Sequence, residues 1–118
     1  MTKGDDIQER LVDLAVSVVR LTEHLPNSAA GKHVGDQLLR SGTSPAFDYG
    51  EVRETEDGKD VSHKLGVVLK DLNETGIALE ILKRSEMISA KVLAPVQREC
   101  KELSQMINSS IKTVEKGK

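Results

Sequence analysis

Apolar residues recur along this chain at alternating steps of three and four, the spacing of one face of an α-helix. The pattern is interrupted around residues 26–28, 55–58 and 85–89, which divides the chain into four amphipathic segments. We expect helices at about residues 6–25, 29–54, 57–85 and 90–116. Because the links are short, neighbouring helices should run antiparallel. Residues 1–118 are therefore predicted to form one all-α domain, an up-down-up-down four-helix bundle.

Short polar side chains and prolines mark the helix ends. The expected N-caps are Asp5 or Asp6 for the first helix, Asn27 or Ser28 for the second, and Asp57 for the third. Glu9 follows in the capping-box position, and Pro26 should close the first helix by forcing the residue before it towards extended geometry. Pro95 lies about six residues into the fourth helix, which starts near Ser89. It should kink the first turns or delay the start to about Leu93.

The third segment is apolar around most of its circumference. Its inner positions are Val61, Leu65, Val68, Leu72, Thr75, Leu79 and Leu82. Flanking them are Val67, Leu69, Ile77, Ala78 and Ile81. A helix with so wide an apolar arc is buried on more than one side. In a chain of 118 residues this predicts self-association.

The second segment carries a stripe of polar and small residues beside its apolar positions. Together with two facing residues of the third segment, this inter-helix polar stripe comprises Gln37, Arg40, Ser41, Ser44, Asp48, Glu51, Lys64 and Glu74. In an antiparallel pair joined near residue 56, two cross-helix ion pairs are predicted, Glu51–Lys64 and Arg40–Glu74. They would fix the register between the helices. The alternative is a polar groove that binds a ligand.

Composition narrows the class of protein. Aromatic residues make up 2 % and charged residues 31 % of the chain, which argues against a β-sandwich. The net charge is −2, so there is no overall basic signal for nucleic acid. Residues 86–118 are nevertheless net positive, with six Lys/Arg against four Asp/Glu. A single cysteine, Cys100, rules out an intramolecular disulfide, and no apolar run approaches the length of a membrane span. A cytoplasmic protein is expected.

No pattern of catalytic or metal-ligating residues stands out. His24, His33 and His63 fall on three different helices or their ends, and none is paired with another ligand at helical spacing. A hydrolytic site would need a nucleophile and a base oriented by a third group, and no such set is recognisable. We therefore expect no enzyme activity, no metal and no cofactor.

A distinctive combination of residues runs through the second and third segments. It consists of Gln37, Leu38, Arg40, Ser41, Ser44, Glu51, Asp60, Lys64, Leu65, Lys70, Glu74 and Thr75. This pattern resembles the bacterial four helix bundle protein family, also described through proteins encoded in intervening sequences of 23S ribosomal RNA genes. The resemblance covers essentially the whole chain. The family often has Asn where this chain has Asp48, which adds a negative charge to the stripe.

The resemblance implies an antiparallel bundle that assembles as a ring-shaped homopentamer. It also implies a link to RNA, because relatives include the accessory protein of diversity-generating retroelements, which works with a reverse transcriptase. That accessory protein is markedly basic, whereas this chain is slightly acidic.

Two functional hypotheses remain open. In the first, the chain is a non-catalytic, nucleic-acid-associated accessory module that works with RNA or a nucleic-acid enzyme. Its predicted phosphate contacts are Arg98, Lys101, Lys112 and Lys116, repeated in every subunit of a ring. In the second, the ring is a structural or protein-interaction scaffold with no nucleic-acid role. The net charge favours the second hypothesis, and the family context favours the first.

Overall fold

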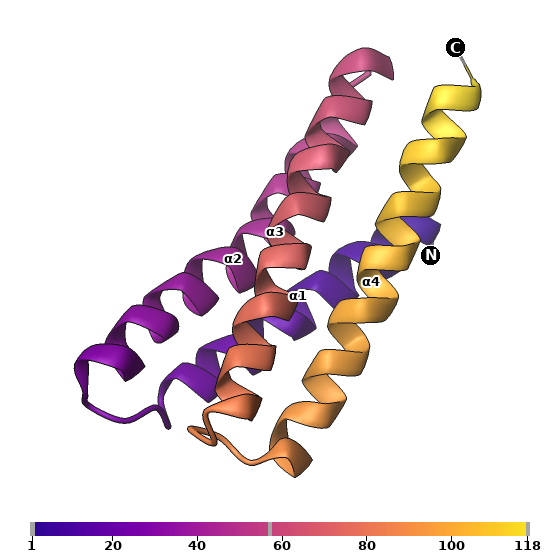
Figure 1. The fold of residues 1–118 in the computed structure, drawn as a ribbon. Coiled ribbons are helices and arrows are strands. Elements are labelled where there is room, and N and C mark those ends of the chain that lie inside the picture. The colour runs from indigo at the N-terminus through magenta and orange to yellow at the C-terminus, as the bar shows by residue number, and fades with distance from the viewer. Residues whose placement is uncertain (1, 57, 118) are drawn as a thin grey trace.

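The computed structural model describes residues 2–56 and 58–117, which form four α-helices joined by short links (Figure 1). The helices are α1 (Lys3–Thr22), α2 (Ala29–Glu54), α3 (Gly58–Arg84) and α4 (Ala90–Lys116). Successive helices run in opposite directions and form a rod with extents of 47 × 23 × 21 Å. Within the described residues, α2 packs between α1 and α3, α3 packs along α4, and α1 meets α4 only lightly. The predicted all-α, up-down four-helix bundle is confirmed.

The start of α1 differs from the prediction. Thr2, not Asp5 or Asp6, caps the helix, because its Oγ1 accepts a hydrogen bond from the Asp5 amide at 3.1 Å. The Asp5 carboxylate in turn accepts a hydrogen bond from the Thr2 amide at 3.1 Å, which completes a capping box. Asp5 is therefore the third-position partner in this box, and Glu9 plays no part in it. The helix begins three residues earlier than expected.

The other helix ends agree more closely with expectation. Ser28 and Ser89 cap α2 and α4, their hydroxyls accepting from the Gly31 and Val92 amides at 3.1 and 3.3 Å. The predicted cap Asp57 lies outside the described residues. α1 ends at Thr22 rather than near residue 25, because the backbone before Pro26 tightens into a turn with bonds spanning three residues.

Pro95 does not delay the start of α4. The helix begins at Ala90, and Pro95 lies inside it. The Ser89 cap satisfies an otherwise free amide of the first turn, so the turn forms ahead of the proline. Of the two predicted effects of Pro95, a kink in the first turns or a start delayed to about Leu93, the delay does not occur.

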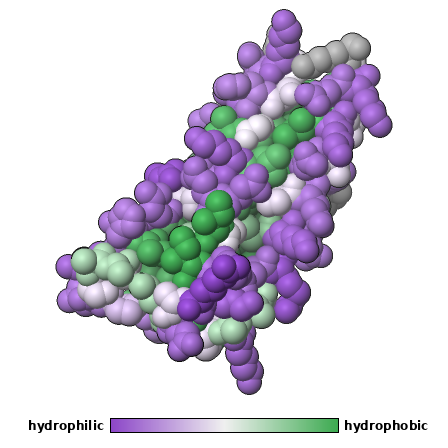
Figure 2. All heavy atoms as spheres, in the orientation of Figure 1, coloured by the Kyte–Doolittle hydropathy of each residue, from purple (hydrophilic) through white to green (hydrophobic). Residues whose placement is uncertain are grey.

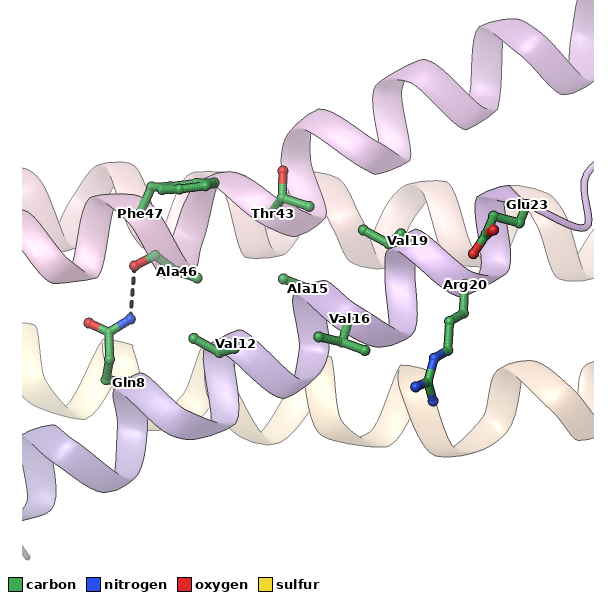
Figure 3. Close-up of a pocket in the computed structure, with 10 residues that line it drawn as sticks. All are labelled: Gln8, Val12, Ala15, Val16, Val19, Arg20, Glu23, Thr43, Ala46 and Phe47. Carbon is green, nitrogen blue, oxygen red and sulfur yellow. Dashed lines mark hydrogen bonds between the residues drawn. The ribbon is translucent and has the colours of Figure 1, made fainter.

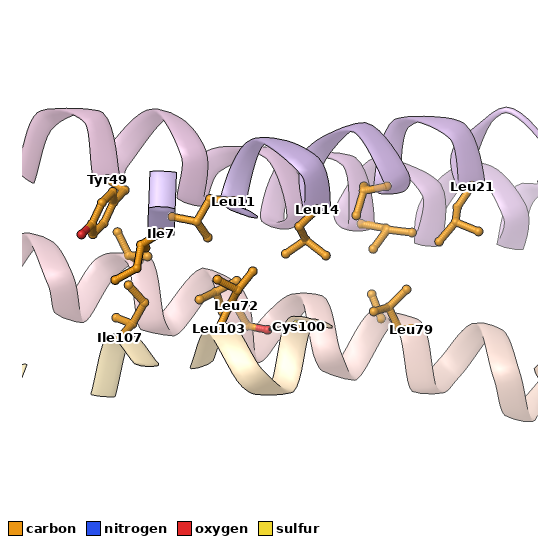
Figure 4. Packing of buried hydrophobic residues seen from close by; sticks show 14 of the residues in the cluster. Ile7, Leu11, Leu14, Leu21, Tyr49, Leu72, Leu79, Cys100, Leu103 and Ile107 are labelled. Carbon is orange, nitrogen blue, oxygen red and sulfur yellow. Dashed lines mark hydrogen bonds between the residues drawn. The ribbon is translucent and has the colours of Figure 1, made fainter. Parts of the chain in front are cut away.

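The core runs along the axis of the bundle and draws on all four helices (Figure 4). Its largest fully buried side chains are Ile7, Leu11, Leu14, Val18, Leu38, Val68, Leu72, Leu79, Leu82, Leu93, Leu103 and Ile107. Burying each of these side chains contributes about 1.5–3 kcal/mol of hydrophobic free energy. All of them occupy apolar positions whose spacing predicted the core. Among the described residues, no helix is long and apolar enough to cross a membrane.

Gly42 sets how closely α1 and α2 approach. A Cβ atom placed on Gly42 would lie 2.6 Å from Cγ2 and 2.8 Å from Cγ1 of Val18, closer than real side chains come. Both residues are buried. The absence of a side chain at position 42 therefore lets Val18 lie against the α2 backbone.

Candidate functional site

Arg40 lies at the centre of the inter-helix polar stripe, where α2 faces α3. Its Nη2 donates to Glu74 Oε2 at 3.0 Å and to Gln37 Oε1 at 2.9 Å. Its Nη1 lies 3.8 Å from Asp71 Oδ1. The predicted Arg40–Glu74 ion pair is thus present, and Asp71 shares the same guanidinium. The arrangement ties one turn of α2 to one turn of α3.

The second predicted pair also forms, nearer the α2–α3 link. Lys64 Nζ lies 3.5 Å from Glu51 Oε2. The Glu51 side chain is 68 % exposed, so solvent screens the attraction and the pair adds little stability. The pair instead helps to fix the register between α2 and α3, because it forms only in the predicted antiparallel alignment.

Asp71, which lies beside the stripe on α3, is a buried carboxyl group, with the whole residue only 8 % exposed. Burial raises the pKa of Asp71 above its usual value, and the negative charges of Asp48 and Glu74 raise it further. The nearby Arg40 guanidinium offsets only part of this increase in the pKa. Asp71 was not among the predicted stripe residues or ion pairs, because its burial depends on how closely α2 and α3 pack.

The two serines of the stripe have different environments. Ser44 Oγ donates to the Arg40 carbonyl at 2.7 Å, so its hydroxyl is satisfied by the backbone of its own helix one turn earlier. Ser41 is 1 % exposed, and its Oγ has no hydrogen-bond partner. Neither serine hydroxyl is hydrogen-bonded to a histidine in the described structure, although His33 lines the same hollow as Ser41. His63, the histidine of α3, is exposed near that helix's start. Within the described residues, no group of three or more His, Cys, Asp or Glu side chains could hold a metal ion.

Cys100 behaves as a packing residue. Its thiol donates to the Leu72 carbonyl at 3.2 Å, and burial raises its pKa to about 11. A thiol with so high a pKa remains protonated at neutral pH and is a poor nucleophile.

The outer side of α4 carries five exposed cations, which we call the basic face. These are Lys91, Arg98, Lys101, Lys112 and Lys116. Their spacing places them on the side opposite the buried Leu93, Cys100, Leu103 and Ile107. The predicted phosphate contacts therefore do share one face, and Lys91, seven residues before Arg98, extends it. Among the described residues, no salt bridge joins any of these cations to a carboxylate.

Arg10 of α1 engages the acidic residues of the neighbouring part of α4. Its Nε and Nη2 donate to the two carboxylate oxygens of Glu99 at 3.0 and 2.5 Å, and its Nη2 lies 3.4 Å from Glu102. Hydrogen bonding to Arg10 lowers the pKa of Glu99. The negative charges that could have neutralised Arg98 and Lys101 are thus directed towards α1.

Two apolar surfaces remain uncovered. The first is a groove of about 640 Å³ between α1 and α2, lined by Val12, Ala15, Val16, Val19, Ala46 and Phe47 (Figure 3). Gln8 closes one end with a hydrogen bond to the Ala46 carbonyl at 2.9 Å, while Arg20 and Glu23 lie at the other end (Figure 3). Phe47, the chain's single phenylalanine, is 77 % exposed at its edge.

The second apolar surface borders the polar stripe between α2 and α3, in a hollow that Gln37, Arg40, Ser41 and Glu74 also line. Figure 2 shows apolar atoms gathered on the visible face of this region. This surface includes Val34, Ile77 and Ile81, and the two isoleucines are 63 % and 46 % exposed. These isoleucines belong to the wide apolar arc that predicted self-association. Of the five flanking residues of that arc, Val67, Ile77 and Ile81 are exposed, whereas Leu69 is half-buried and Ala78 is buried.

Comparison with known proteins agrees with the fold. Residues 5–109 match the protein family described as "23S rRNA-intervening sequence protein". A crystal structure of a protein of unknown function from the S23 ribosomal protein family of Bacteroides thetaiotaomicron is similar, with 30 % sequence identity and a TM-score of 0.86. The similarity covers 94 % of this chain and 99 % of that one. No curated protein matches. Since the family match spans most of the chain, this protein belongs to the 23S rRNA-intervening sequence protein family.

Proposed function

We propose that this chain is a non-catalytic, homo-oligomeric accessory module that associates with nucleic acid. The basic face of α4 carries the proposal: five exposed cations on one helix, with no carboxylate paired to them in the described structure. Lysine and arginine side chains that neutralise phosphates release condensed counterions, which is the main source of sequence-independent affinity. The family's name, which refers to an intervening sequence of 23S rRNA, supports RNA as the partner.

Assembly supplies the avidity that one protomer lacks. A net charge of −2 makes a single chain a weak nucleic-acid ligand. Repetition of the basic face around a ring makes binding multivalent, so the second and later contacts form at high effective concentration. A long nucleic acid can then be held by contacts that are individually weak.

The two uncovered apolar surfaces support self-association. They lie on different sides of α2, one towards α1 and one towards α3. A head-to-tail contact, in which the α2–α3 surface of one subunit packs into the α1–α2 groove of the next, covers both surfaces at once. Such heterologous contacts generate rings when the rotation between subunits closes. The family resemblance points to five subunits.

The inter-helix polar stripe supports a non-catalytic role. Arg40 donates to both Gln37 and Glu74, and the Ser44 hydroxyl donates to the Arg40 carbonyl. Groups already engaged in this way act on the register between α2 and α3. We therefore assign the stripe to the specificity of folding.

The alternative is a scaffold that binds another protein and no nucleic acid. The apolar α1–α2 groove and the acidic net charge favour it. A groove with an exposed Phe at its edge suits an apolar segment of a partner protein.

Salt dependence separates the two functions. The protein is recovered from lysate of its own host at low salt, and the bound nucleic acid and protein are quantified as the salt concentration rises. Nucleic acid that is released steeply with salt, and that nuclease digestion removes, supports the accessory module. A co-purifying protein retained independently of salt, with no nucleic acid, contradicts it and favours the scaffold.

A further inference from the structure

We propose that the basic face of α4 binds the phosphate backbone of double-helical nucleic acid in preference to single strands. This inference rests on the proposed nucleic-acid function and specifies its ligand. RNA and DNA duplexes share the chemistry that would be recognised, two rows of phosphates at a fixed separation.

The charge on the basic face is left free by the packing of α1 against α4. Helix α4 contains three acidic residues, Glu99, Glu102 and Glu115. Arg10 binds the first through two hydrogen bonds and lies within 3.4 Å of the second. Arg98 and Lys101 are therefore exposed with no carboxylate paired to them in the described structure, while Glu102, 62 % exposed, remains beside them.

The face has no platform for stacking bases. The chain contains one Phe, one Tyr and no Trp. Phe47 and Tyr49 both lie on α2, which packs against α1 and α3, and Tyr49 is buried. Proteins that hold single strands combine a basic groove with aromatic side chains on which successive bases stack. The basic face supplies charge alone, so it contacts phosphates and reads neither base identity nor an unstacked strand.

The spacing of the cations suits a rigid double helix. Arg98 and Lys101 form one group, and Lys112 and Lys116 form a second, about 16 Å further along the helix from Lys101 to Lys112 at 1.5 Å per residue. A major groove of B-DNA is about 12 Å wide, and long side chains add reach at both sides. The minor groove of A-form RNA is also wide and shallow. A helix laid across either groove places one group on each wall.

Rigidity strengthens the preference. The helix fixes the separation of the two groups, and a duplex fixes the separation of its phosphate rows. A flexible single strand must be ordered to align with both groups, and that ordering lowers its affinity. With no stacking to compensate, the duplex is the favoured ligand.

The test measures binding of the full chain to labelled probes by fluorescence anisotropy. The probes are an RNA duplex of mixed sequence of about 20 base pairs, two helical turns, the DNA duplex of the same sequence, and each separate strand. Affinity is followed between about 50 and 200 mM salt. Comparing the two duplexes shows whether RNA or DNA is preferred. A second duplex of scrambled sequence tests whether bases are read.

We compare three double variants, each of which lacks two positive charges of the wild type. They are Arg98→Gln with Lys101→Gln, Lys112→Gln with Lys116→Gln, and as a matched control Lys32→Gln with Lys83→Gln, two exposed cations on α2 and α3. Either α4 variant should lower the slope of log affinity against log salt by about two for each subunit in contact. The control should leave the slope unchanged.

The expected result is several-fold tighter binding of both duplexes than of their strands, with equal affinity for the scrambled sequence. Single strands that bind as tightly as duplexes, or a control variant that weakens binding as much as the α4 variants, would overturn the duplex inference while leaving the nucleic-acid function intact. Failure of every probe to bind would overturn both.

Discussion

Arg10 on α1 and Glu99 on α4 form a two-point ion pair, with Nε to Oε2 at 3.0 Å and Nη2 to Oε1 at 2.5 Å. The two residues are 89 positions apart in sequence, and both side chains are less than a third exposed. Because α1 otherwise meets α4 only lightly, this pair closes the bundle between the first and last helices. It also withdraws negative charge from the basic face.

Replacing Arg10 with Met should weaken that closure. The Glu99 carboxylate would remain partly buried without its hydrogen bonds, so the free energy of unfolding should fall by about 1–2 kcal/mol. Chemical denaturation at pH 7 measures the change. The control is Lys32→Met, which alters an exposed cation on α2 that lines neither apolar surface and should change stability by less than about 0.5 kcal/mol.

The Arg10–Glu99 pair also predicts a pH dependence. Arg10 lowers the pKa of Glu99 in the folded protein below the ordinary value of 4.5. Its contribution is therefore complete above that value and is lost as the pH falls through the folded pKa. Unfolding curves measured from pH 7 down to pH 3 should show the difference between wild type and Arg10→Met shrinking. A difference that stays constant over this range would mean that the pair adds no electrostatic stability.

Asp71→Asn should stabilise the protein at neutral pH. Burial and the neighbouring acidic groups raise the pKa of Asp71, so the folded state binds its proton more tightly than the unfolded chain does. The charged carboxylate is thus unfavourable at pH 7, and the neutral amide removes that cost. The gain should shrink as the pH falls through the raised pKa and wild-type Asp71 becomes protonated. A loss of stability at pH 7 would instead show that the contact with Arg40 dominates.

Gly42→Ala should destabilise the bundle although alanine favours helices. The added methyl group would meet both γ-methyls of Val18 within 2.8 Å, so α1 must shift or Val18 must leave its rotamer. We expect a loss of about 1–3 kcal/mol in thermal or chemical unfolding. Gly66→Ala is the matched control, because nothing lies within 4 Å of its Cβ position, and it should gain up to about 1 kcal/mol. Combining Gly42→Ala with Val18→Ala should recover part of the loss.

Self-association should depend on the two uncovered apolar surfaces. Phe47→Ser and Ile77→Asp each alter a side chain that is mostly exposed in the protomer, so helical content should be unchanged. Analytical ultracentrifugation should show each variant shifting towards smaller species. Lys70→Asp, an exposed change elsewhere on α3, should leave the assembly intact. Unchanged mass for both Phe47→Ser and Ile77→Asp would exclude these surfaces as the subunit contact.

The sequence predicted those features that depend on local spacing. Steps of three and four placed Leu72 and Leu103 in the core, and the antiparallel link near residue 56 brought Arg40 opposite Glu74. Features that depend on three-dimensional approach were missed. The Arg10–Glu99 pair joins helices far apart in sequence, and nothing local to either residue signals the other. Likewise, the sequence does not distinguish Gly42, which lets Val18 lie against α2, from a glycine that only lowers helix propensity.

The positions of the helix ends were predicted only in part. For α2 the sequence left Asn27 and Ser28 as alternatives, and Ser28 is the cap. For α4 the sequence predicted a start near Ser89, which agrees with the Ser89 cap. At the N-terminus, Thr2, Asp5 and Asp6 all suit an N-cap, and the choice follows from which of them completes the reciprocal hydrogen bonds. Propensity alone does not distinguish the cap from its third-position partner.

The most direct test of the account is native mass spectrometry of the protein purified at low salt from its own host, before and after nuclease treatment. The account predicts a homo-oligomer, with five subunits expected, that carries extra mass removed by the nuclease. A monomer with no nuclease-sensitive mass would contradict both the assembly and the nucleic-acid role.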